Sequence, residues 1–171
     1  MLKGKVLIMN FRDFFRRWKL DSIRINTKFA EMEFVSTEDD QTAAWDMYVE
    51  LITRITTQPL SQDEGDEAAA LDSIYSIFDI TREILKSKGR NAESFTKIAI
   101  VVLNQVIRPF TSKWHKKKLN GAFADSAECL IFRNELSNLQ AELIQYTKSL
   151  ADLAMVEDLT VILEEDDETQ E

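Results

Sequence analysis

Apolar residues recur every three or four positions along most of the chain, and this spacing predicts α-helices. Three long segments that follow it cover about 37–58, 67–87 and 92–119, and a fourth begins after Asp125. Each segment ends near residues that stop helices or favour turns, such as Pro59. Because each predicted helix has one apolar face to bury, we expect the four to pack on one another.

The fourth predicted helix has the most regular pattern in the chain. Its apolar positions alternate between steps of three and four, the heptad spacing of a helix seam. The seam consists of Cys129, Phe132, Leu136, Leu139, Leu143, Tyr146, Leu150 and Leu153. A seam of this kind packs on the other helices of a bundle or on a second chain. The flanking positions show no coiled-coil charge pattern, which favours packing within the bundle.

The segment 98–107 is apolar except for Asn104 and Gln105, so a helix here would be covered on nearly every side. We expect it to form the centre of the molecule. Pro109 removes a backbone donor from the same helix and disfavours helical geometry at Arg108. A kink or break is therefore expected near 105–109.

The N-terminal part carries two different patterns. Residues 5–20 place large apolar side chains at helical spacing with basic residues beside them, which predicts an amphipathic helix. Residues 22–34 begin with strict alternation, which predicts a strand or loose hairpin. A single strand leaves its backbone groups unpaired, so it needs a second strand or another protomer.

The start of the first long helix and the loop after it are both acidic. Thr37 with Asp40 resembles a capping box in which Asp replaces Glu. The loop 60–67 contains several carboxylates, but they lack the spacing of a calcium-binding EF-hand. We expect these acids to stabilise the N-terminus of the following helix.

The fold predicted from these patterns is mainly all-α: an up-down bundle of about four principal helices, with an N-terminal amphipathic helix and a short β strand or hairpin. Residues 1–35 form an arm, 36–157 the helical bundle domain and 158–171 an acidic C-terminal tail. The short run Val161 to Leu163 in this tail is a candidate docking peptide.

Composition supports this fold and excludes several kinds of site. Four Gly and two Pro in 171 residues favour long helices over a turn-rich β fold. One Cys and one His exclude an intrachain disulfide, a Cys-based zinc site and a His-rich metal cluster, so we expect no cofactor and no metal. The longest apolar run is about half a membrane span, and the N-terminal run is too short for a signal peptide. We therefore expect a soluble, cytoplasmic protein.

Charge alternates along the chain in four blocks. Residues 1–35 carry a net charge of +4, residues 36–80 of −10, residues 81–121 of +8 and residues 122–171 of −11. Neighbouring antiparallel helices of opposite charge attract one another, which is one explanation of the pattern. The other is a basic pole that binds an acidic partner.

Two groups of residues are candidates for binding. The first is the basic pole, where cations surround a tryptophan as in sites for phosphate or single-stranded nucleic acid: Arg108, Lys113, Trp114, His115, Lys116, Lys117 and Lys118. The second lies on the first predicted helix, where aromatic and basic side chains adjoin and a partner protein is expected: Phe14, Phe15, Arg16, Arg17 and Trp18.

Arg108 and His115 are separated by six residues. This spacing resembles the R-x4-6-H pattern of the HEPN ribonucleases, which are also α-helical. The resemblance implies an Arg and a His that converge across a dimer to cleave RNA. The chain departs from the usual pattern because Pro109 follows the Arg where a polar residue is typical.

No hydrolase, P-loop or zinc-protease motif is present. We therefore expect a non-enzymatic protein–protein interaction module, an accessory or regulatory subunit of a cytosolic complex of bacterial type. Its partner is expected to be another protein or a second copy of the chain, ahead of nucleic acid or a membrane surface. Phosphate binding at 108–118 and HEPN-like cleavage by Arg108 and His115 are the alternatives.

Overall fold

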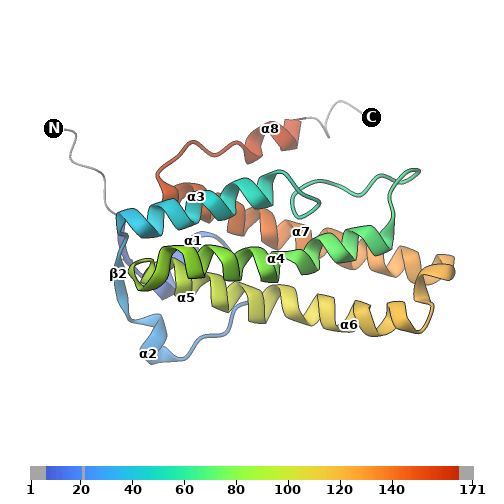
Figure 1. The fold of residues 1–171 in the computed structure, drawn as a ribbon, viewed down its shortest axis with the longest axis horizontal. Coiled ribbons are helices and arrows are strands. Elements are labelled where there is room, and N and C mark those ends of the chain that lie inside the picture. Colours follow the sequence, from blue (N-terminus) through green and yellow to red (C-terminus); the bar gives the residue numbers. More distant parts are fainter. Residues whose placement is uncertain (1–6, 21, 166–171) are drawn as a thin grey trace.

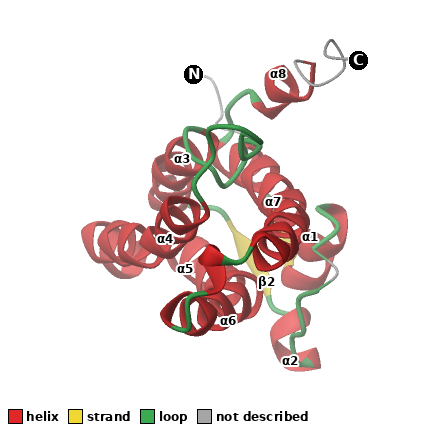
Figure 2. Cartoon of the chain, turned by 90° about the vertical axis from the view of Figure 1, so that its right-hand side faces the viewer, coloured by secondary structure: helices red, strands yellow, loops and turns green. Residues whose placement is uncertain are grey.

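A computed structural model describes residues 7–20 and 22–165 of the chain (Figure 1). Four long helical segments run alternately up and down: α3 (Glu38–Ile52), α4 (Glu67–Lys88), the joined α5 and α6, and α7 (Ser126–Ala154). Seen along the bundle, they surround a common core, while α8 (Thr160–Glu165) lies outside it (Figure 2). The predicted mainly all-α bundle is confirmed.

The third long segment is one continuous helix with an irregular middle. It consists of α5 (Glu93–Val102), the π-helical turn η2 (Leu103–Ile107) and α6 (Arg108–Leu119). In η2 the backbone N–H of Arg108 donates to the carbonyl of Leu103, five residues earlier. Pro109 then stands in the first turn of α6, where a missing N–H is tolerated. The expected irregularity near the proline is thus a π turn, and helix continues on both sides of it.

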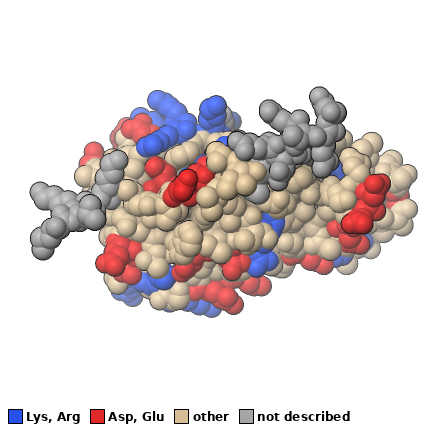
Figure 3. Space-filling view, turned by 90° about the horizontal axis from the view of Figure 1, so that it is seen from above, with Lys and Arg blue, Asp and Glu red and all other residues tan. Residues whose placement is uncertain are grey.

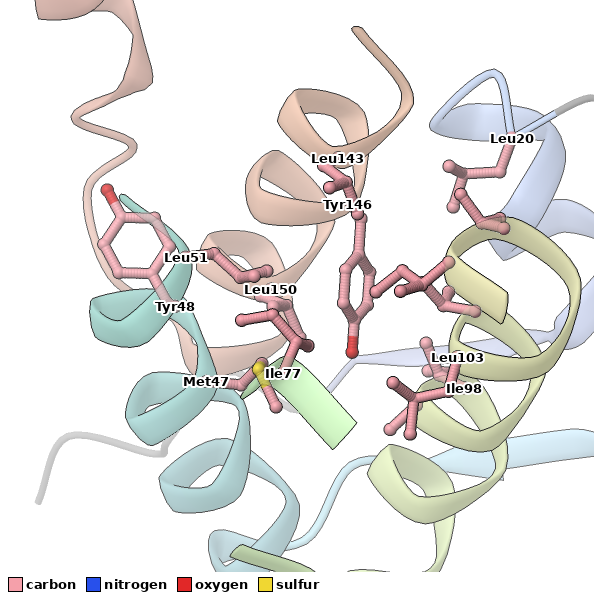
Figure 4. Packing of buried hydrophobic residues seen from close by; sticks show 14 of the residues in the cluster. Leu20, Met47, Tyr48, Leu51, Ile77, Ile98, Leu103, Leu143, Tyr146 and Leu150 are labelled. Atoms are coloured by element: carbon pink, nitrogen blue, oxygen red, sulfur yellow. The ribbon is translucent and has the colours of Figure 1, made fainter. Parts of the chain in front are cut away.

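The core lies between the four helical segments, and the seam of α7 faces it. Every seam residue except Cys129 is buried. In the close view of the core, the Tyr146 ring projects from α7 towards α5, whereas the Tyr48 ring, which is also buried, lies on the side of α3 away from Tyr146 (Figure 4). The central segment is less completely covered than predicted, because Ile100 is 44% exposed.

The N-terminal residues form a small cap on one end of the bundle. Strand β1 (Ile8–Asn10) pairs antiparallel with β2 (Glu33–Val35), and α1 (Phe11–Arg17) and α2 (Thr27–Ala30) lie between them in the chain. The predicted helix over 5–20 therefore begins only at Phe11, where the Asn10 side chain accepts from the backbone N–H of Asp13. The partner strand comes from the same chain, but the strand predicted over 22–34 is limited to its end at Glu33–Val35, because Thr27–Ala30 form α2.

Short elements complete the fold. The 3-10 turn η1 (Gly89–Asn91) connects α4 to α5, and η3 (Ala122–Ala124) connects α6 to α7. Helix α3 ends at Ile52, earlier than its apolar pattern, and an irregular loop follows it up to α4. Part of the predicted acidic tail forms α8, and residues 166–171 lie outside the described residues.

Candidate functional site

Most lysines of the basic pole form ion pairs within the chain. Lys113 pairs with Glu135 of α7, and Lys117 pairs with Glu128 of the same helix. On the other side of α6, Lys118 Nζ lies 3.0 Å from the Asp72 carboxylate of α4. Neighbouring helices of opposite charge thus neutralise one another, and Arg108 and Lys116 are the exposed cations of the pole without a carboxylate partner among the described residues.

Trp114 lies inside the bundle and presents no face on which a nucleic-acid base could stack. Its side chain is fully buried, between the rings of Phe123 and Phe132. The indole Nε1 donates to Glu135 at 2.9 Å. Burial alone would raise the pKa of Glu135, but hydrogen bonds from Lys113 and Trp114 and the nearby lysine charges outweigh it and lower that pKa. Trp114 is a buried anchor of α6 on α7.

Arg108 and His115 share one face of α6, the face towards α4. The Arg108 guanidinium lies 4.9 Å from the centre of the Phe78 ring and donates to Asn104 at 3.0 Å. Two turns further, the His115 ring packs edge-on against Tyr75 with the ring centres 4.7 Å apart. The common face exists because helix continues through Pro109.

A carboxylate adjoins the histidine. His115 Nε2 lies 3.9 Å from Asp72 Oδ1, and the imidazole is only partly exposed. An imidazole beside a carboxylate can exchange protons with a bound molecule. The same Asp72 carboxylate also binds Lys118, so it lies between the imidazole and the ammonium group.

The aromatic residues predicted to dock a partner from the first helix are mostly buried in the chain itself. Phe14 and Phe15 belong to the core, and Trp18 is half-buried. Arg16 and Arg17 are exposed, and the Arg17 guanidinium lies 5.3 Å from the Trp18 ring. The helix therefore covers the end of the bundle and presents its cations to solvent.

A groove between α3 and α4 was not singled out by the sequence. It has a volume of about 410 Å³, and the residues that line it come from one face of each helix: Trp45, Asp46, Val49, Glu50, Ile80, Glu83, Ile84 and Ser87. Trp45 is 44% exposed and Val49 is 38% exposed. Both follow the helical spacing of the apolar residues of α3, but this apolar face is wider than the buried one, so its edge opens into the groove.

A second cavity of about 330 Å³ lies between α6 and α7. Its floor is apolar, with Val106, Phe110 and Leu139, and Lys113 and Glu135 stand at its edge as the ion pair described above. Its lysine and one of its two carboxylates neutralise each other, and the other carboxylate belongs to Glu142.

The single cysteine does not have the environment of a nucleophile. Burial raises the pKa of the Cys129 thiol, the charges of Glu67 and Asp125 add to this, and only Arg133 opposes them. Its sulfur lies 3.5 Å from the Phe123 carbonyl oxygen. Within residues 7–20 and 22–165, no group of three or more His, Cys, Asp or Glu side chains converges to hold a metal ion.

Comparisons with known protein families, with curated proteins and with solved structures give no match for this chain. Within the described residues, no helix combines the length and the apolar composition that crossing a membrane requires.

Proposed function

We propose that this chain is a non-enzymatic protein–protein interaction module, an accessory or regulatory subunit of a cytosolic complex, which binds its partner in the groove between α3 and α4. The observation that supports this proposal is the exposed side chain of Trp45 beside Val49. The two stand over a floor to which Ile80 and Ile84 contribute. Tryptophan is enriched at the centres of binding interfaces, where its large apolar surface and its N–H both find partners.

The surrounding surface is consistent with a protein partner. Seen from above, uncharged surface separates scattered Asp and Glu groups, and the most prominent cluster of Lys and Arg lies at the upper border of the picture (Figure 3). Apolar patches with polar borders mark interaction sites. Because Trp114, Phe14 and Phe15 are buried, we propose the groove as the docking site in place of the two surfaces suggested by the sequence.

The test is affinity capture of partners by the full chain and by a Trp45→Ala variant. The substitution removes an exposed side chain, so the variant is expected to fold and to lose the captured partner. Leu119→Ala is the matched control, since Leu119 is 87% exposed at the far end of α6 and should change nothing. A partner retained equally by all three proteins would refute the groove as the docking site.

A ribonuclease of the kind that the HEPN resemblance implies is the second candidate. It is favoured by the common face of Arg108 and His115 and by Asp72 beside the imidazole. In this function, His115 is the general acid–base and Arg108 binds the scissile phosphate. The expected result is metal-independent cleavage of RNA that His115→Ala abolishes and Lys116→Ala leaves intact. Equal RNA cleavage by the original protein and both variants would exclude a ribonuclease site at His115.

A further inference from the structure

The groove between α3 and α4 is lined by carboxylates and by no cation. Its charged lining residues are Asp46, Glu50 and Glu83, and the part of the chain that the structure describes contributes no Lys or Arg to it. Asp46 is bound from outside the lining by Lys88 at 3.2 Å, and Glu50 by Arg54 at 2.6 Å.

Glu83 differs from the other two carboxylates. It is exposed, and no ion pair reaches it within residues 7–20 and 22–165. The groove therefore presents at least one free negative charge next to its apolar floor. A cation on the partner would complete this pairing in a partly desolvated position, where charge pairs contribute most to specificity.

The apolar positions of the groove have the spacing of a helix-binding site. Trp45 and Val49 are four residues apart on α3, and Ile80 and Ile84 are four residues apart on α4. Residues at this spacing lie one turn apart on the same face of a helix. The groove thus has two apolar residues one turn apart on each helix, a spacing that matches two anchor side chains at i and i+4 of an incoming helix.

We infer that the groove binds a basic amphipathic helix of a partner protein, with two apolar anchors one turn apart and Lys or Arg beside them. This inference rests on the proposed function and adds the chemistry of the partner. An isologous contact with a second copy of the chain is disfavoured, because it would bring the unpaired Glu83 carboxylates of the two grooves together. The chain's own acidic end and the phosphates of nucleic acid are repelled for the same reason.

Three synthetic peptides of about 18 residues test the inference, because shorter isolated helices are marginally stable. All carry the same apolar i, i+4 face, and their polar faces are lysine-rich, glutamine-rich or glutamate-rich. Each is titrated onto the full chain, with labelled-peptide anisotropy for affinity and the NMR signal of the Trp45 indole N–H for location. Circular dichroism checks that the three peptides are equally helical, so that differences in affinity reflect their charge and not their conformation.

The lysine-rich peptide should bind about tenfold tighter than the glutamine-rich peptide, with the glutamate-rich peptide weakest. Raising salt from about 50 to about 300 mM should remove most of this preference. Glu83→Gln should reduce the affinity for the lysine-rich peptide but not for the glutamine-rich peptide. Trp45→Ala should weaken the binding of both of these peptides. As a surface substitution, Glu83→Gln should leave the fold intact, which thermal unfolding checks.

Other results would overturn the inference in distinguishable ways. Equal binding of the lysine-rich and glutamine-rich peptides, or no effect of Glu83→Gln, would refute a basic partner and leave the groove as a docking site. Failure of all three peptides, together with Trp45-dependent capture of a protein, would refute a helical occupant. Loss of Trp45-dependent capture itself would instead refute the proposed function.

Discussion

The carboxylate of Asp40 accepts a hydrogen bond from the backbone N–H of Phe95 at 2.8 Å, although the two residues are 55 positions apart in sequence and lie in different helices. The other carboxylate oxygen accepts from the backbone N–H of Thr37 at 2.9 Å and closes the capping box of α3. One buried side chain therefore satisfies donors at the N-termini of both α3 and α5, where both helix dipoles favour its charge.

Replacing this carboxylate should cost more than the loss of an ordinary helix cap. Asp40→Ala removes two caps and leaves a buried N–H at Phe95 without a partner, so we expect a loss of about 2–4 kcal/mol of unfolding free energy. Urea denaturation measures it. Glu38→Ala is the control, because Glu38 is an exposed acid of the same first turn and should change stability by at most about 0.5 kcal/mol. Similar losses in both variants would show that Asp40 does not connect the helices.

Gly65 should not tolerate a side chain. A Cβ at this position would lie 2.3 Å from the carbonyl oxygen of Ser61 and 2.7 Å from the Leu60 side chain, so the loop would have to move. Arg133 of α7 donates to both the Ser61 and Gly65 carbonyls, which resists such movement.

We therefore expect Gly65→Ala to destabilise the protein by about 1–3 kcal/mol. The midpoint of urea unfolding measures this change. Glu64→Ala in the same loop is the control and should be nearly neutral. If Gly65→Ala leaves the midpoint unchanged, the loop is not held against α7 as the structure shows.

Stability should fall at alkaline pH because two tyrosines are buried. Burial raises the pKa of Tyr146 far above its ordinary value, and burial also raises that of Tyr48 despite a hydrogen bond that its oxygen accepts from Leu159. The unfolded chain releases these protons near pH 10, before the folded chain does, so stability is constant below about pH 10 and decreases above it. Tyr146→Phe should make this decrease shallower in urea titrations at increasing pH. An unchanged slope would contradict the burial of the Tyr146 hydroxyl.

Acid should weaken the contact between α6 and α7. The lowered pKa of Glu135 means that its interactions with Lys113 and Trp114 stabilise the protein above the unfolded-state value near 4.5 and are lost as pH falls below it. Glu135→Gln should therefore lower the urea midpoint at pH 7, with a smaller difference from the original protein at pH 3.5. Glu142→Gln, on the same helix, should show no such dependence; a constant difference for Glu135→Gln would argue against the ionic contact.

Local signals in the sequence were sufficient to predict the helical bundle. Three predicted features depend only on residues a few positions apart, and the structure contains each of them. They are the seam of α7, its cap at Asp125 and the capping box of Thr37 with Asp40. The contact of Asp40 with Phe95 was not predictable in this way, because it depends on how two distant helix ends meet. The ion pair of Lys118 with Asp72 was unpredictable for the same reason, because it also joins two helices that are distant in sequence.

The candidate sites were harder to predict, since a residue type does not reveal which side of a helix is covered. Phe14 and Trp114 are aromatic residues next to cations in the sequence, as is typical of a binding surface, but both lie in the core. Trp45 has the spacing of a core residue but is exposed. A helical pattern specifies a face with an uncertainty of about one residue, or 100° of rotation, and this is the angle that separates a buried edge from an open groove.

The π turn at η2 changes the angular phase of everything that follows it. Before the turn, the helix buries Phe95, Ile98 and Val102; after it, Phe110 and Trp114 are buried, one residue later than an uninterrupted α-helical repeat would place them. Deleting a single residue from η2 would rotate α6 by about 100° about its axis. That rotation would turn the Trp114 indole out of the bundle and carry Arg108 and His115 away from α4. The extra residue in the π turn therefore sets which face of α6 is buried in the bundle and which face carries Arg108 and His115.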